Sequence, residues 1–222
     1  MAMLAQDKRT TKRIGDRSTG KGAPNRGVGA LDLVASEAEK GIITLVDGAA
    51  VPFRPIRPED APALKRFHRR LSPHSIHLRF FGAKPELSDK KARYFACVDG
   101  IDRYALVALD PERPQEIIAT AGFYRLGNTD RAEYAAAVED RWQGRGLGLA
   151  LTRLLIGPAL RRKVRVFTGV VLAENARMLN LFRDLNLPER LLYEDGAEYV
   201  EIDLRPESRN GELLEERRAR GG

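Results

Sequence analysis

The chain has 222 residues, of which 43% are hydrophobic and 31% are charged, and this composition is typical of one soluble globular domain. No apolar segment approaches the roughly 20 residues that a membrane-spanning helix needs, so we expect no association with a membrane. The polar N-terminus carries no secretory signal, and the single cysteine, Cys97, excludes an internal disulfide, so we expect a cytoplasmic protein.

The net charge of +7 belongs mainly to the N-terminal end of the chain. Residues 1–30 contain seven Lys and Arg against two Asp, whereas residues 31–204 carry a net charge of only +1. A basic tail on a nearly neutral body is weak evidence for a nucleic-acid partner, and we expect none. Residues 1–40 are predicted to be a disordered basic tail, residues 41–204 the folded domain, and residues 205–222 a charged C-terminal tail.

The predicted elements of the body alternate between strands and helices. Short apolar or alternating runs bounded by turn signals predict strands at residues 42–46, 51–56, 104–109, 116–124, 131–138, 165–172, 191–193 and 199–204. Apolar residues at helical spacing predict helices at residues 58–70, 72–81, 88–97, from the glycine-rich segment near 146 to 161, and at 174–185. Gly157-Pro158 should kink or end the fourth helix early. This order favours an α/β fold with a mixed, twisted sheet and helices on both faces.

A glycine-rich segment, VEDRWQGRGLG at residues 138–148, joins a predicted strand to a predicted helix. Glycine inside a helix costs about 1 kcal/mol relative to alanine, so three glycines here indicate that the backbone approaches a ligand closely. The first N–H groups of a helix lack internal partners and lie at the positive end of its dipole. The segment therefore predicts a site for an anion, most plausibly a phosphate or pyrophosphate.

Two familiar phosphate-binding patterns do not fit this segment. The dinucleotide fingerprint needs a third glycine where the chain has Leu149, and the magnesium–nucleotide loop needs Gly-Lys-Ser/Thr. The remaining pattern, Gln143-x-x-Gly146-x-Gly148 after a strand, resembles the acetyl-coenzyme A (acetyl-CoA) signature of the GNAT superfamily of N-acetyltransferases. The alternative interpretation is a glycine-rich turn that only helps the helix to pack on the sheet.

The GNAT resemblance covers residues 50–204 and implies a mixed, twisted sheet of six to seven strands within an acetyltransferase domain at 41–204. It implies acetyl-CoA as cosubstrate, with the pyrophosphate on the backbone amides of the glycine segment and the pantetheine arm along the end of the preceding strand. We expect no metal, because His74 and His77 have no carboxylate or cysteine beside them in the sequence. The expected cofactor-binding residues are Ala136, Ala137, Val138, Gln143, Gly144, Arg145, Gly146, Leu147, Gly148, Asn175 and Phe182.

Two of these residues carry open alternatives. Asn175 lies where family members commonly have an asparagine near the pantetheine, but it is also an ordinary helix-start residue. Phe182 lies on the helix face where many relatives use a tyrosine to protonate the leaving thiolate, and a phenyl ring has no proton to give. Tyr134 and Tyr193 are the spare candidates for that role, although packing suits both of them better.

The general base is predicted to be Glu133. A lysine amine is about 99.9% protonated at neutral pH, so some group must accept a proton before or during attack on the thioester. Glu133 lies on the strand that leads to the glycine segment, and Ala135 and Ala137 on the same face leave space for a substrate. Burial there would raise its pKa toward a useful value. The alternative is a strand glutamate that faces solvent or pairs with an arginine.

Two further segments, SPHSIHLRFFG and LSDKKARYFACVDGIDRYALVAL, are similar to the acetyltransferase domains of bacterial Pat-type protein lysine acetyltransferases, which modify acyl-CoA synthetases. The matching positions are Ser72, Ser75, residues 79–81, 87–88, 98–99 and 102–103. The resemblance implies a protein lysine as acceptor, for example in an acyl-CoA synthetase, and a glutamate base at the position of Glu133. A small-molecule amine is the alternative acceptor, and a non-catalytic acyl-CoA sensor or interaction module is the alternative class. The oligomeric state stays open between monomer and dimer.

Overall fold

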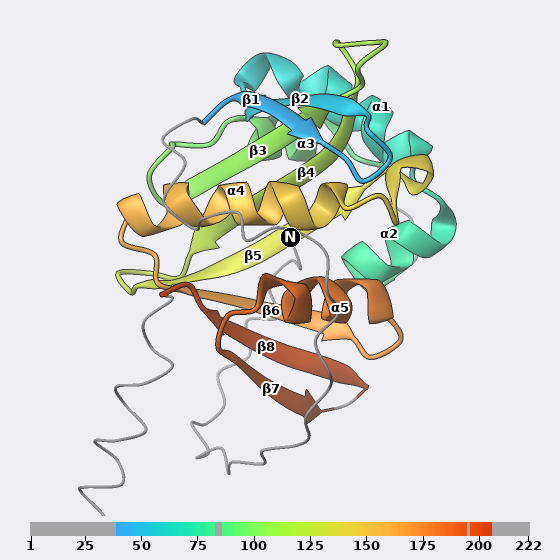
Figure 1. Ribbon diagram of the computed structural model, residues 1–222. Coiled ribbons are helices and arrows are strands. Elements are labelled where there is room, and N and C mark those ends of the chain that lie inside the picture. The colour runs from blue at the N-terminus through green and yellow to red at the C-terminus, as the bar shows by residue number, and fades with distance from the viewer. Residues whose placement is uncertain (1–38, 83–85, 195, 206–222) are drawn as a thin grey trace, which may run out of the picture.

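A computed structural model describes residues 39–82, 86–194 and 196–205 of the chain (Figure 1). The tails expected at residues 1–40 and 205–222 therefore lie almost wholly outside the described residues. The described part forms one eight-stranded sheet with helices on both faces, which confirms the expected fold class. The sheet is larger than the expected six to seven strands, because all of the strand-like runs of the sequence join it.

The strands are β1 Gly41–Thr44, β2 Ala50–Pro55, β3 Arg103–Leu109, β4 Ile117–Arg125, β5 Arg131–Val138, β6 Val166–Leu172, β7 Glu189–Glu194 and β8 Ala197–Asp203. The helices are α1 Ala61–Arg70, α2 Pro73–Phe80, α3 Asp89–Ala96, α4 Leu147–Arg161 and α5 Ala176–Leu185, with short 3-10 turns η1 Pro58–Asp60 and η2 Asp140–Trp142. These bounds agree with the predicted elements to within a few residues.

The sheet order is β1-β2-β3-β4-β5-β6-β8-β7, and every neighbouring pair is antiparallel except β5 and β6. The parallel pair is short. Its register runs from Arg131 opposite Val166 to Glu133 opposite Thr168 and ends there. On its other edge β5 stays paired with β4 as far as Val138. The two parallel strands therefore splay apart, and the C-terminal half of β5 has one open edge.

Two apolar layers cover the sheet. On one face, α4 and α5 pack with buried side chains such as Leu151 and Phe182 against Phe167 of β6. On the other face, α1, α2 and α3 cover the sheet near β2, β3 and β4, with Leu64 and Ile76 in the core between them. In Figure 1, α4 and α5 lie in front of the strands, and α1 and α3 lie behind them. The splayed half of β5 lies between these two groups.

The expected early end of α4 at Gly157-Pro158 was wrong, because the helix continues through Pro158 to Arg161. A proline removes one backbone hydrogen bond and crowds the preceding turn, which usually kinks a helix. Here Pro158 lies close to the C-terminal end and its ring is buried, so only the last turn carries that cost. Beyond it, the Arg162 N–H donates to the carbonyls of Pro158 and Ala159 and closes the helix.

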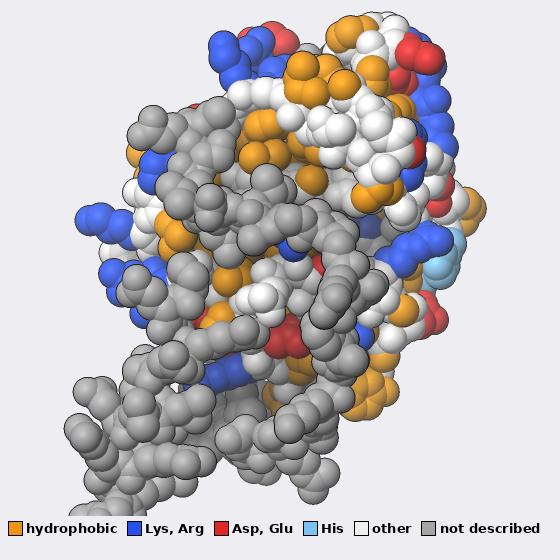
Figure 2. All heavy atoms as spheres, viewed as in Figure 1, with side chains coloured by type: hydrophobic (Ala, Val, Ile, Leu, Met, Phe, Trp, Pro, Cys, Tyr) orange, Lys and Arg blue, Asp and Glu red, His pale blue; other side chains and the backbone are white. Residues whose placement is uncertain are grey.

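The described surface carries both signs of charge side by side. Figure 2 shows basic and acidic side chains interspersed on the face in view. Several of them pair across elements, such as Arg66 with Glu116 and Lys65 with Asp89. This distribution agrees with the near-neutral body that the sequence indicated.

Candidate functional site

The loop between β5 and α4 requires its glycines for two different reasons. Gly144 and Gly146 have φ angles of 71° and 84°, a left-handed backbone that side chains disfavour. A Cβ on Gly148 would lie 3.3 Å from Leu181 and 3.4 Å from Val138, so this glycine permits close packing of α4. Around the Cβ position of Gly144, no described atom lies within 4 Å. The loop is therefore open beside Gly144 and closely packed beneath Gly148.

The N-terminus of α4 presents backbone amides without a capping side chain. Gly146 is the N-cap residue and makes no side-chain cap hydrogen bond. The side chain of Leu147 is fully buried in the core, so only its backbone faces the loop. A 15-residue helix places partial positive charge at this end. An uncapped helix start of this kind suits an anion, and the predicted pyrophosphate site at these amides stays a prediction.

Arg145 adds positive charge beside the loop but is held by two neighbours. Its Nε donates a 2.6 Å hydrogen bond to Asp47 in the β1–β2 turn, and its guanidinium lies 4.3 Å from the centre of the buried Trp142 ring. The sequence analysis did not find Asp47, because 98 residues separate it from Arg145. Arg145 is therefore tied to the β1–β2 turn and to the ring of Trp142.

The side chain of Gln143 makes three hydrogen bonds that hold the loop to neighbouring elements. Its side-chain Nε2 donates to the carbonyl of Val138 at 2.8 Å and to the hydroxyl of Ser75 at 3.1 Å, and its Oε1 accepts from Arg177 at 2.5 Å. These contacts join the end of β5 to α2 and to α5. The structure thus gives Gln143 a bracing position in the loop, and any direct contact with a cofactor stays a prediction.

The open edge of β5 presents backbone amides to the space that β6 has left. The Glu139 N–H donates to the Ile118 carbonyl of β4 at 2.8 Å. Because successive residues of a strand direct their backbone groups to alternate sides, the N–H groups of Val138 and Ala136 point away from β4. A ligand that enters between β5 and β6 would meet these two amides.

A small cavity of about 50 Å³, which we call the notch, lies between the splayed strands. It is lined by side chains and backbone of β5, β6, α2 and α5: Leu78, Arg79, Phe81, Glu133, Tyr134, Ala135, Ala136, Gly169, Val170, Val171, Asn175, Met178 and Phe182. The Oδ1 of Asn175 accepts the N–H of Met178 at 3.2 Å, so the helix-cap interpretation of this residue is confirmed. Both Asn175 and Phe182 also line the notch, where a cofactor contact remains a prediction.

Tyr134 and Tyr193, the alternative candidates for protonating the thiolate, lie in other environments. The Tyr134 hydroxyl bonds the Thr152 hydroxyl at 2.7 Å in the buried layer beneath α4, and burial raises the pKa of Tyr134 to about 12. Its ring meets Phe182 edge-on at 5.7 Å. Tyr193 lies on the edge strand β7 and is 65% exposed. The structure thus supports packing and surface positions for them, as the sequence analysis favoured.

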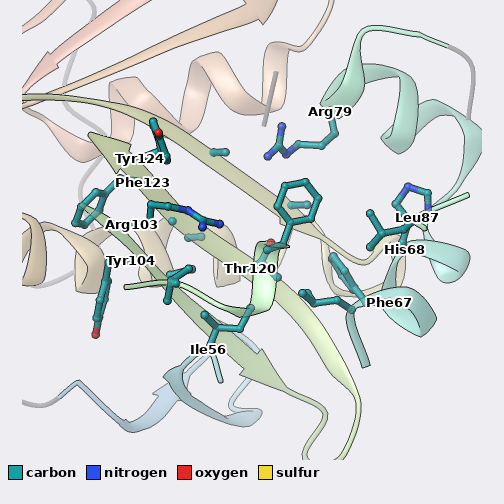
Figure 3. Close-up of a pocket in the computed structure, with 18 of the residues that line it drawn as sticks. Ile56, Phe67, His68, Arg79, Leu87, Arg103, Tyr104, Thr120, Phe123 and Tyr124 are labelled. Atoms are coloured by element: carbon teal, nitrogen blue, oxygen red, sulfur yellow. The ribbon is translucent and has the colours of Figure 1, made fainter. Parts of the chain in front are cut away.

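A larger cavity of about 150 Å³ lies on the opposite side of β5, under α1, α2 and α3 (Figure 3). Most of its wall is apolar, with aromatic side chains such as Phe67 and Phe123. Ala135 and Ala137 form part of this wall, so the small neighbours of Glu133 do leave space beside it. Ala137 therefore faces this cavity with its side chain rather than the notch.

Glu133 lies where the notch and the larger cavity meet. It is one of three residues that line both, together with Arg79 and Ala135. Its cross-strand neighbours are Tyr124 on β4 and Thr168 on β6. The Arg79 side chain, which extends from α2 toward the cavity in Figure 3, acts electrostatically on Glu133. Sequence reasoning noted Arg79 only as part of a similarity and did not place it here.

Within the described residues, no group of three or more His, Cys, Asp or Glu side chains is close enough to hold a metal ion. His77 instead lies 3.2 Å from Glu174, at the start of α5. No helix in the described ranges has the length and apolar character needed to cross a membrane.

The structure places an uncapped helix start directly after β5, at the glycine segment that carries the GNAT resemblance. Residues 71–186 match the family model for the Acetyltransferase (GNAT) family, which is more than half of the chain. The chain belongs to the GNAT family, and the resemblance stated from the sequence is confirmed. The protein is therefore an acetyltransferase that uses acetyl-CoA as its acyl donor.

Known relatives support this assignment. The acetyltransferase PA5475 of Pseudomonas aeruginosa is 32% identical over 150 residues, which are 67% of this chain and 81% of that protein. The GNAT domain of S. lividans PAT is similar in structure, with a TM-score of 0.69 at 34% identity over 74% of this chain and 96% of that domain. The cAMP-binding acyltransferase from Mycobacterium smegmatis matches with a TM-score of 0.54 at 25% identity. The match covers 80% of this chain but 52% of that protein, about half its length.

Proposed function

We propose that this acetyltransferase moves the acetyl group of acetyl-CoA directly to the ε-amine of a lysine in a protein acceptor, with Glu133 as general base. The observation that carries the proposal is the position of Glu133 on the wall shared by the notch and the larger cavity. An acetyl thioester in the notch and an amine in the larger cavity would meet beside this carboxylate. No acyl-enzyme is needed, because the two substrates reach each other.

The cofactor would lie along the loop and the open strand edge. Its pyrophosphate would accept hydrogen bonds from the backbone amides at residues 144–148, where Gly144 leaves the approach open. Its pantetheine arm would pair with one of the two N–H groups that Ala136 and Val138 direct away from β4, which leaves the other for the thioester end. Its thioester would then end in the notch between Asn175 and Phe182.

In the reaction, the neutral amine nitrogen attacks the thioester carbonyl carbon, and the carbonyl π electrons move to oxygen. A strand amide at the open edge, that of Ala136 or Val138, would stabilise this oxyanion. The Glu133 carboxylate accepts the N–H proton. When the carbonyl re-forms, the C–S bond breaks and the sulfur leaves with its electron pair. Transfer of a proton to that sulfur, from Glu133 or water, yields the amide and the thiol.

A lysine acceptor fits the character of the larger cavity. Its wall is mainly apolar and would cover the methylene stem of a lysine, while the amine reaches Glu133. The sequence similarity to Pat-type enzymes and the structural similarity to the S. lividans PAT domain support the same acceptor class. A lysine of an acyl-CoA synthetase is the acceptor we would test first.

A small amine is the second candidate, because a cavity of about 150 Å³ walled partly by Arg79 and Arg103 would also hold a whole small amine that carries a carboxylate. A non-catalytic acyl-CoA sensor is the third candidate. The position of the Glu133 carboxylate between the two cavities favours an enzyme over such a sensor.

The test follows thiol release from acetyl-CoA with a panel of acceptors: acyl-CoA synthetases, lysine peptides, polyamines and amino acids. The proposal predicts release with the protein or peptide acceptors and acetyl-lysine in the product by mass spectrometry. Release only with free amino acids or polyamines would assign the small-amine function instead. Tight acetyl-CoA binding without release for any amine would leave the sensor class.

A further inference from the structure

Arg79 occupies a position that the proposed reaction has not used. It is the one cation among the described residues that line the notch, and it also lines the larger cavity. Its helix, α2, is fixed at its start, where the Ser72 hydroxyl accepts the Ser75 N–H at 3.1 Å and both serine hydroxyls donate to Asp140 at 2.7 Å. The helix that carries Arg79 is therefore anchored at its start, and its Arg79 side chain lines the junction of the two cavities.

The surroundings of Arg79 are apolar, with one dominant counter-charge. Burial lowers its pKa to about 10, while the nearby Glu133 carboxylate and, more weakly, the Tyr134 hydroxyl oppose that shift. It therefore stays cationic at neutral pH. The other charged or titratable side chains that line the two cavities are His68, Arg103, Tyr104 and Tyr124, all in the larger one.

We propose that the Arg79 guanidinium is a catalytic residue that stabilises the negative charge on the coenzyme A sulfur as it leaves. The inference rests on the proposed function, because it assumes a thioester in the notch. Before reaction, the Arg79 guanidinium and the Glu133 carboxylate line the same junction of the two cavities. When Glu133 accepts the amine proton it becomes neutral, and Arg79 loses its counter-charge at the moment when the C–S bond breaks and the electron pair moves to sulfur. The thiolate then takes the place of the carboxylate as the anion beside Arg79.

This exchange keeps the net charge of the junction constant, so the negative charge that develops on sulfur is compensated when the C–S bond breaks. Proton return from Glu133 to the sulfur then resets the site without a dedicated acid. Three other side chains near the site are less suited to this role. Phe182 has no proton to give, and the Tyr134 hydroxyl bonds Thr152 on the other face of β5. Arg103 lines the larger cavity only, where it donates to the backbone carbonyls of Tyr94 and Cys97.

The test measures the pKa of the thiol of coenzyme A bound to the protein, from the ultraviolet absorbance of the thiolate, and so needs no acceptor. The Glu133→Gln variant removes the competing carboxylate. In this variant we expect the bound thiol to have a lower pKa than free coenzyme A. Adding Arg79→Gln should raise the bound thiol pKa by about 1 to 2 units, the usual effect of losing a cation within a few ångströms. Arg69→Gln, on the exposed side of α1, is the matched control and should leave it unchanged.

Kinetics give a second readout. Arg79→Gln alone should lower kcat by about 100-fold with a small change in the dissociation constant for acetyl-CoA, and Arg79→Lys should recover part of the loss. An equal thiol pKa with and without Arg79 would overturn the inference. If the double variant does not fold, a bound thiol in Glu133→Gln with a pKa at or above that of free coenzyme A overturns it as well. Failure of the unaltered protein to bind coenzyme A at all would remove the proposed function together with this inference.

Discussion

The carboxylate of Asp140 accepts a 2.7 Å hydrogen bond from the hydroxyl of Ser75, and this contact joins the glycine loop to helix α2. The same carboxylate accepts the N–H and hydroxyl of Ser72 at 2.9 and 2.7 Å. Gln143, three residues further along the loop, also donates to Ser75. Hydrogen bonds therefore tie the loop that would hold the pyrophosphate to the helix that carries Arg79.

Replacing the Asp140 carboxylate should weaken the hydrogen bonds between the glycine loop and α2. Asp140→Asn is expected to destabilise the protein by about 1 kcal/mol at neutral pH, because three hydrogen bonds lose their charged acceptor near the surface. Burial alone would raise the pKa of Asp140, but the hydrogen bonds from Ser72 and Ser75 outweigh it and hold the pKa below the ordinary value. A carboxyl with a lowered folded-state pKa stabilises above its unfolded value of about 3.9, and the gain is lost as pH falls through the folded value.

The measurement is urea unfolding of both proteins between neutral pH and about pH 3. The difference in unfolding free energy should be constant near neutrality and shrink below about pH 4. A difference that does not depend on pH would contradict the charge argument.

Gly146→Ala tests the loop. A non-glycine residue in the left-handed region costs about 1–2 kcal/mol, and at φ 84° the alanine would pull the first amides of α4 out of place. We expect the dissociation constant for coenzyme A to rise about 10-fold or more by calorimetry. Gly127→Ala is the matched control, since Gly127 has φ 58° in the β4–β5 turn with no described atom within 4 Å of its Cβ position. It should lose similar stability and bind coenzyme A normally.

Tyr134→Phe separates packing from proton transfer. The buried hydroxyl bonds Thr152, so its removal should lower the unfolding free energy by about 1 kcal/mol. Because that hydroxyl points under α4 rather than toward the reacting atoms, kcat should change by less than about 2-fold, which corresponds to under half a kcal/mol of barrier. Steady-state rates with thermal unfolding check both parts. A loss of kcat near 100-fold would contradict this and would identify Tyr134 as the general acid that protonates the leaving thiolate.

Thr120→Leu tests the acceptor assignment of the larger cavity. Thr120 lines this cavity from β4, and it is directly opposite Ala137 in the sheet (Figure 3). Filling the space with a larger side chain should raise the KM for the acceptor by about 10-fold, the kinetic equivalent of about 1.4 kcal/mol. The KM for acetyl-CoA should stay within a factor of about two, because the notch is on the other side of β5. The reverse pattern would place the acyl donor in the larger cavity.

Local sequence signals predicted most of the fold and the outline of the site. The glycines of the loop, the strand before it and the cap at Asn175 each depend on residues close in sequence, and the structure places them as expected. The contacts that organise the site join distant segments. Asp140 and Ser75 are 65 residues apart, and Asp47 and Arg145 are 98 apart. A single sequence gives no signal for such pairs, and the same holds for the approach of Arg79 to Glu133.

Helix α4 is the opposite case. Its sequence contains a strong local signal for a helix end, and the structure does not follow it. Gly157-Pro158 predicted a kink or an early end of α4, but the helix continues to Arg161 with Pro158 buried. Tertiary burial can exceed the cost of one missing hydrogen bond when few turns follow.

The most direct test of the whole account is the turnover rate of Glu133→Gln, measured beside its dissociation constant for acetyl-CoA. Glutamine keeps the shape of the side chain but cannot accept a proton. The account predicts at least about a 100-fold fall in kcat with amine acceptors, while acetyl-CoA binding stays within a few-fold of the unaltered protein. Turnover at the full rate with normal binding would contradict it.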